Sequence, residues 1–144
     1  MRERSRARGW ALQALYAWES RGEPETPLGM LEELERDRSI ADASVTYARQ
    51  LLHNFQEHRT DVDRAIQESL SNWRLERLSV IDRNILRLAT SEMMHIADVP
   101  PRVSIQEAIE LAEKYGTHES PRFVNGVLDA LMRAQAGAHD QENA

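Results

Sequence analysis

The stretch of sequence that decides the fold lies at residues 103–129 and reads VSIQEAIELAEKYGTHESPRFVNGVLD. Ser104 and Glu107 have the spacing of a capping box, in which a hydroxyl and a carboxylate satisfy the free backbone N–H groups at the start of a helix. Apolar residues recur at helical spacing after this start signal, and Gly116 then supplies a stop signal. The first half of the stretch therefore predicts one amphipathic helix that ends at Gly116.

The second half of the stretch predicts another helix, with two unfavourable residues inside it. Ser120 and Pro121 form a start signal, because proline is tolerated at the first helical position, where its missing N–H has no partner to lose. Apolar side chains follow at helical spacing, at Val124, Val127, Leu128 and Leu131. Asn125 and Gly126 interrupt them, and a glycine inside a helix costs about 1 kcal/mol relative to alanine. Since no alternating strands flank this pair, we exclude a hairpin turn and expect packing or a partner to offset the cost.

Helical signals continue along the rest of the chain, and no segment alternates like a strand. One helix is predicted from about Ser5 to Ser20, and others are predicted to begin at Thr26, Asp42, Thr60 and Ser79. The spacing of Thr60 and Asp63 resembles a second capping box. Pro100 and Pro101 predict an extended break before the stretch quoted above. We therefore expect an all-α fold of about seven helices.

The chain length suits one domain or two subdomains that share a core, since the sequence has 144 residues. We predict an N-terminal helical subdomain at residues 1–58, which includes an Arg-rich arm, and a C-terminal helical subdomain at residues 59–133. Residues 134–144 are small and polar without periodicity, so we predict a disordered tail there.

The composition restricts the compartment and the chemistry. The sequence has no cysteine, which excludes disulfides, thiolate nucleophiles and Cys-ligated zinc and fits a reducing cytosol. No apolar run is long enough to span a bilayer, and the N-terminus lacks the apolar stretch of a signal peptide. We expect a cytoplasmic protein without membrane contact.

No motif in the sequence predicts an enzyme. The histidines lack the spacing of a zinc site and are better explained as surface residues; they are His53, His58, His95, His118 and His139. The sequence has no Gly-rich phosphate loop, no nucleophile elbow and no dinucleotide fingerprint. We therefore expect no catalytic residue, no metal and no cofactor.

Two features fit RNA. The first eight residues hold Arg2, Arg4, Arg6 and Arg8, although the net charge of the whole chain is −6. Arginines bridge phosphates with planar guanidinium groups, and Arg-rich segments bind RNA; an Arg-rich terminus that only keeps the protein soluble explains the composition equally well. Phe123 follows Arg122 in the first turn of its helix and can offer a ring for base stacking, although most such rings belong to the core.

Several segments, in order and spacing, resemble the NusB family of transcription antitermination factors over nearly the whole chain. The matching segments, after Arg8, are ALQALY at 11–16, IDRNILRLA at 81–89, DVP at 98–100, VSIQEAIELA at 103–112 and FVNGVLD at 123–129. Each segment alone is a weak signal, and their combination is specific.

The resemblance implies a fold, a function and a set of sites. It implies two perpendicular helical bundles that bind the boxA segment of ribosomal leader RNA together with the ribosomal protein NusE, and that join RNA polymerase with other Nus factors. The RNA-binding residues that we expect are Arg2, Arg4, Arg6, Arg8, Glu119, Arg122 and Phe123. The residues that we expect to bind NusE are Tyr16, Glu76 and Asp82. We further expect the starts of the helices that carry Arg8 and Phe123 to converge into one RNA-binding surface.

Two alternatives remain open. The chain resembles the RNA-recognition module that is fused to ribosomal RNA methyltransferases, although it has neither a methyltransferase domain nor a catalytic cysteine. A self-associating helical interaction module is the other alternative, and some members of the family form homodimers that hide the RNA surface, so self-association can coexist with the main function.

Overall fold

The computed structural model describes residues 2–23, 26–40 and 42–143, with side chains except those of residues 2, 42 and 139–143. Within these ranges the fold is all-α, as predicted, with six α-helices and no strand. The elements are α1 (Arg2–Ser20), α2 (Pro27–Arg38), α3 (Asp42–Ser69), the 3-10 helix η1 (Leu75–Arg77), α4 (Val80–His95), α5 (Pro101–Tyr115) and α6 (Ser120–Asn143). None of the helices in this part of the chain is both long enough and apolar enough to cross a membrane.

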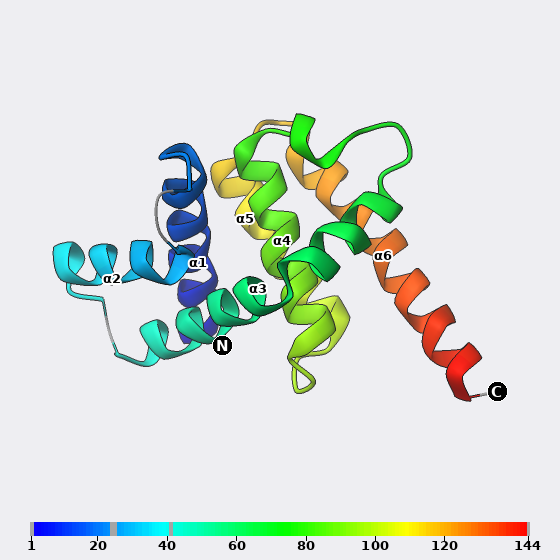
Figure 1. Cartoon of the computed structure of the whole chain (residues 1–144), viewed down its shortest axis with the longest axis horizontal. Helices are drawn as coiled ribbons and strands as arrows, with labels where there is room; N and C mark the ends of the chain where they lie inside the picture. Colours follow the sequence, from blue (N-terminus) through cyan, green and yellow to red (C-terminus); the bar gives the residue numbers. More distant parts are fainter. Residues whose placement is uncertain (1, 24–25, 41, 144) are drawn as a thin grey trace.

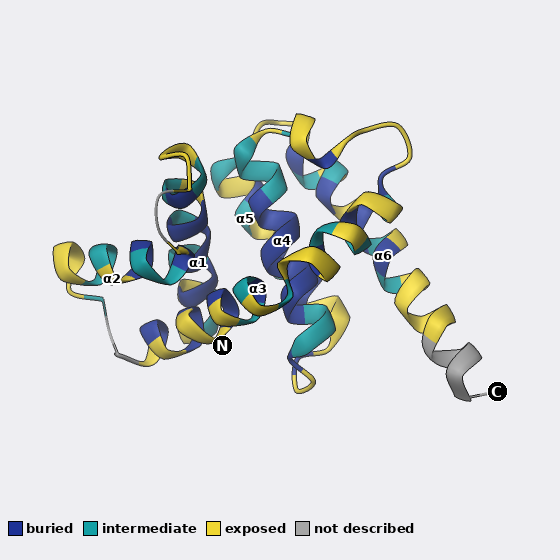
Figure 2. Cartoon of the chain, viewed as in Figure 1, coloured by how far each residue is buried: buried dark blue, intermediate teal, exposed yellow. Residues whose placement is uncertain are grey.

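Helix α4 forms the centre of the molecule and contacts α1, α3, α5 and α6. Its residues 84–92 are all buried, so that the helix is covered on every side (Figure 2). Helices α1 and α2 pack on α3, and α5 packs with α6; in the view of Figure 1, α5 lies between α1 and α4, and α6 lies on the side of α4 away from α1. Trp18 and Phe55 join α1 to α3 through an edge-to-face contact with ring centroids 6.1 Å apart.

Helix α3 explains why the structure has six helices instead of about seven. The two helices predicted on either side of Thr60 are one helix with a kink, where His58 has non-helical φ and ψ angles of −120° and 21°. The predicted capping box is wrong, because the carboxylate of Asp63 accepts hydrogen bonds from Arg87 at 3.0 and 3.1 Å instead of capping the backbone. The kink lies beside the boundary predicted between residues 58 and 59, and α3 continues across it.

The capping box predicted at Ser104 is also wrong. Helix α5 begins at Pro101, so Ser104 lies inside the helix, where it is 1% exposed. Its hydroxyl donates a hydrogen bond of 2.6 Å to Glu92 of α4. The sequence prediction failed because Pro101 itself occupies the first helical position, where proline needs no N–H. The predicted end at Gly116 and the predicted start at Ser120 are confirmed.

Helix α6 continues through residues 134–143, where the sequence predicts a disordered tail. This part of the helix extends away from the other helices (Figure 1), and residues 133–138 are exposed. Alanine is the best helix former, and Ala134, Ala136 and Ala138 occur here. The helix therefore continues by intrinsic propensity, without an apolar face to bury.

Candidate nucleic-acid interface

Arg8, predicted to contact RNA, is buried in the structure. Its side chain is 7% exposed and forms ion pairs with Glu92 of α4 at 3.0 Å and with Glu107 of α5 at 3.3 Å. Its guanidinium group also lies over the ring of Tyr47, 5.6 Å from the centroid. Arg8 is therefore not available to a phosphate in this structure. Instead it fastens the start of α1 to α4 and α5.

Glu92 collects the hydrogen bonds of this buried network. It accepts from Arg8, from the hydroxyl of Ser104 and from the phenol of Tyr47. Burial raises the pKa of Tyr47 above its ordinary range, and the hydrogen bond to Glu92 raises it further. The phenol therefore stays protonated and remains a donor at any physiological pH.

Arg4 and Arg6 face solvent, in contrast to Arg8. The side chain of Arg4 is 41% exposed, pairs with Asp98 at 3.1 Å and lies 4.4 Å from the centroid of Tyr47. Such an exposed pair contributes little to stability and is readily exchanged for a phosphate. Arg6 is exposed and forms no ion pair with the described residues. The side chain of Arg2 lies outside the described residues.

A groove with a volume of about 450 Å³ runs between α1 and α5 beside Arg6. Arg6 and Gln13 line it from α1, and Lys114 and Tyr115 line it from the end of α5. Gln13 donates a hydrogen bond of 3.5 Å to the hydroxyl of Tyr115. Lys114 is exposed and is the only lysine of the chain. The groove thus carries a cation from each of its two helices, together with the carboxylates of Glu107 and Glu110 from α5.

The start of α6 forms a second region with exposed polar groups. Phe123 is half-buried, and Arg122 and Glu119 are exposed beside it. Arg122 forms no ion pair with any residue that the structure describes. All three line a hollow with a volume of about 860 Å³. A partly exposed ring can stack with a base, and a free guanidinium group beside it can pair with a phosphate.

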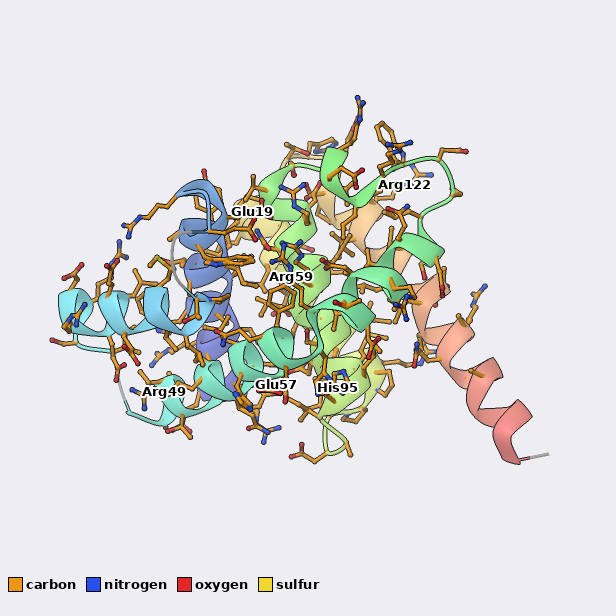
Figure 3. The ribbon with its side chains drawn as sticks, in the orientation of Figure 1. Glu19, Arg49, Glu57, Arg59, His95 and Arg122 are labelled. Atoms are coloured by element: carbon orange, nitrogen blue, oxygen red, sulfur yellow. The ribbon has the colours of Figure 1, made fainter. Side chains whose placement is uncertain are left out.

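The two regions do not converge, contrary to the expectation. Arg8 pairs with Glu92 near the end of α4, whereas Phe123 lines a smaller cavity together with Asp82 in the first turn of α4. The rise of a helix between residues 82 and 92 is about 15 Å. Figure 3 shows Arg122 near one edge of the molecule and His95, the end of α4, near the opposite edge. The groove between α1 and α5 is lined by Arg6 and by Tyr115, and Tyr115 is close in sequence to Thr117, which lines the smaller cavity.

The residues predicted to bind a partner protein lie on three neighbouring elements. Tyr16 of α1 is 45% exposed, and Glu76 of η1 is exposed. Asp82 is half-buried, and its atom Oδ1 is buried without a hydrogen-bond partner among the described residues. Because this oxygen is buried, a cationic group from another molecule can reach only the solvent-exposed part of the Asp82 side chain.

Arg83 holds these three elements together, and the sequence reasoning did not single it out. Its guanidinium group donates to the carboxylate of Glu19 in α1 and to the carbonyl oxygens of Leu75 and Leu78 at 3.1 and 2.8 Å. Burial by itself would raise the pKa of Glu19, but the hydrogen bonds and charges of Arg83 and Arg87 hold it below its ordinary value. The hydrogen bond to Glu19 also raises the pKa of Arg83. Both groups are therefore charged, and one buried pair positions the surface around Asp82.

The histidines include one close pair. His58, at the kink of α3, stacks on His95, at the end of α4, with ring centroids 3.8 Å apart and an interplanar angle of 15°. Burial lowers the pKa of His95, and the neighbouring His58 lowers it further. Among the described residues, no group of three or more His, Asp or Glu side chains is arranged to hold a metal ion.

Comparison with known proteins identifies the family. The sequence profile of the NusB family matches residues 5–133. The chain belongs to the NusB family. It is 38% identical to the transcription antitermination protein NusB of Symbiobacterium thermophilum, over 98% of this chain and 96% of that protein. It is 42% identical to the NusB protein of Myxococcus xanthus, over 93% of this chain and 97% of that protein.

Two solved NusB structures share the fold. NusB of T. maritima is 40% identical, with a TM-score of 0.83, and the match covers 90% of each chain. A NusB protein solved with NusE and double-stranded RNA is 32% identical, also with a TM-score of 0.83, and the match covers 93% of this chain and 98% of that one. The start of α6 lies within the matched NusB profile, and so does α1 from Ser5 onward, whereas Arg4 precedes the match.

Proposed function

We propose that this chain is an RNA-binding transcription antitermination factor that binds the boxA segment of ribosomal leader RNA together with the ribosomal protein NusE. It then joins RNA polymerase and other Nus factors and promotes transcription of ribosomal RNA. One observation carries the proposal: the chain resembles, over 93% of its length, a NusB protein whose structure was solved with NusE and double-stranded RNA.

In this proposal boxA is bound as an unpaired strand, because sequence-specific readers of RNA act mostly on unpaired bases. The exposed guanidinium groups of Arg4 and Arg6 hold phosphates at one end of the strand. The strand follows the groove between α1 and α5 past Lys114, whose charge faces solvent. It reaches the start of α6, where a base stacks on Phe123. An extended strand can join two regions that do not touch.

Arg8 has a different role in this proposal, since its burial and its two ion pairs keep it from phosphate. It fixes the direction of the first turn of α1 and so presents Arg4 and Arg6 along the groove. We class Arg8 as a positioning residue.

NusE binds at the surface of Tyr16, Glu76 and Asp82. The support is the partly exposed side chain of Asp82, which lies in the first turn of α4 beside Arg83, the residue that joins α1, η1 and α4. A basic side chain of NusE would pair with the solvent-exposed part of this side chain, and a charge pair desolvated in an interface can be worth about 2 kcal/mol or more.

The proposal makes the chain a binding protein without catalytic activity, metal or cofactor, and it places its action in the cytoplasm with RNA polymerase. A self-associating helical module is the second candidate, favoured by the exposed ring of Tyr16 on the same surface. A homodimer that hides this surface would compete with NusE.

The experiment that tests the proposal is a titration of labelled boxA RNA with the full chain, with and without NusE, with light scattering to count subunits. We expect a one-to-one-to-one complex and tighter RNA binding when NusE is present. A dimer that binds neither RNA nor NusE would support the self-associating module and refute the proposal.

A further inference from the structure

Trp73 is the most exposed large apolar side chain among the described residues, with 57% of its surface open to solvent. It lies in the loop between α3 and η1, which passes beside the first turns of α6 (Figure 1). The loop is held in place by Gln67, whose amide donates 2.9 Å to the carbonyl oxygen of Trp73 and accepts 2.9 Å from the backbone N–H of Leu75. The fold thus fixes the backbone of an exposed indole that it does not bury.

Gly126 presents a second unexplained feature. A Cβ atom at this position would meet no described atom outside its own helix turn within 4 Å, so packing inside the chain does not require glycine. Gly126 is exposed and lines the 860 Å³ hollow together with Trp73 and Phe123. The destabilising glycine therefore lines the hollow at a position where a Cβ would meet open space.

The charged residues around the hollow are suited to an anionic ligand that also carries aromatic rings. Arg122 lines the hollow, and Arg77 lines the smaller cavity on the other side of Trp73 and Phe123. Neither arginine forms an ion pair with the residues that the structure describes. Glu119 borders both cavities and can accept a hydrogen bond from an exocyclic amino group of a base.

We propose that this hollow is a base-binding subsite for single-stranded RNA, in which Trp73 and Phe123 both stack on bases and the nucleotide chain passes close over Gly126. The inference rests on the proposed function and extends it by a second aromatic platform. RNA accounts for all parts of the hollow at once. Rings stack with every base, free guanidinium groups pair with phosphates, and a missing Cβ allows close approach.

The test uses Gly126→Ala, because the inference predicts opposite effects of this change on stability and on binding. Removing a mid-helix glycine should raise the Tm by about 4 °C. The added methyl group should weaken binding of a labelled single-stranded boxA RNA at least several-fold. Gly137→Ala is the matched control, because Gly137 also lies inside α6 with no described atom near its missing Cβ and lies outside the hollow. It should leave RNA affinity unchanged and raise the Tm by less, because this end of α6 extends away from the other helices.

Trp73→Ala should weaken the same RNA by roughly ten- to a hundredfold, and Trp73→Phe should restore most of the affinity because it keeps a ring. NusE affinity, measured without RNA, should not change for either variant. If the wild-type chain binds boxA and Gly126→Ala and Trp73→Ala bind it equally well, the subsite is refuted and the proposed function stands. If Trp73→Ala loses NusE and keeps RNA, the hollow is a protein-docking site. A wild-type chain that binds no RNA would refute the proposed function itself.

Discussion

Replacing Arg8 with alanine tests whether an arginine near the start of α1 has a structural role or a role in RNA binding. The change removes one partner of a buried ion pair whose side chains are 7% and 2% exposed, and it leaves Glu92 with a charge that Tyr47 and Ser104 alone must satisfy. Breaking such a pair by removing one partner typically costs about 3 to 5 kcal/mol. We expect Arg8→Ala to lower the free energy of unfolding by about that amount.

The assay is urea unfolding followed by circular dichroism, with Arg6→Ala as the matched control from the same helix turn. Arg6 is exposed and unpaired among the described residues, so its removal should change the free energy of unfolding by less than about 0.5 kcal/mol. Arg6→Ala should instead reduce the slope of the logarithm of the RNA-binding constant against the logarithm of the salt concentration by about 0.7. This is the contribution of one phosphate contact on a single strand. The reasoning would be refuted if Arg8→Ala were as stable as wild type and lost the same salt dependence as Arg6→Ala.

Three further predictions concern the other regions. Phe123→Ala should weaken boxA binding by roughly ten- to a hundredfold in a fluorescence anisotropy titration without unfolding the protein, and unchanged affinity would remove Phe123 from the site. Asp82→Lys should abolish the complex with NusE in size-exclusion chromatography while helicity remains intact, and an intact complex would show that the interface lies elsewhere. Because the pKa of His95 is lowered in the fold, the unfolded chain binds more protons below the ordinary value of 6.5, so stability should fall as the pH drops below 6.5. His58→Ala should reduce this dependence in thermal unfolding between pH 7 and pH 5, and an unchanged pH profile would contradict the pairing.

The sequence allowed the helices to be predicted where local signals decide them. Gly116 and Ser120 mark helix ends through backbone chemistry that acts within a few residues, and both predictions are confirmed. The capping boxes predicted at Thr60 and Ser104 do not form, because Asp63 and Ser104 hydrogen-bond to side chains of another helix instead. Ser104 donates to Glu92, and Asp63 accepts from Arg87, and neither partner lies within the local window that a capping motif describes.

The candidate site was predicted less completely for the same physical reason. Arg4, Arg6 and Arg8 look equivalent in the sequence, yet Arg8 meets a carboxylate 84 positions further along the chain. Only the packing of α1 against α4 determines which arginine faces inward. The sequence does not single out Arg83, because its role lies in contacts to α1 and to η1 with its C-cap, and an arginine in a helical pattern gives no local sign of them.

The measurement that tests the central claim most directly is an NMR titration of the full, isotope-labelled chain with single-stranded boxA RNA, read as shifts of the backbone amide signals. The claim is that one strand runs from the exposed arginines of α1 along the groove to the start of α6. We predict large shifts in residues 3–6 and 114–126 and small ones around His53. Shifts confined to α2, or equal shifts with a scrambled RNA of the same length, would contradict it.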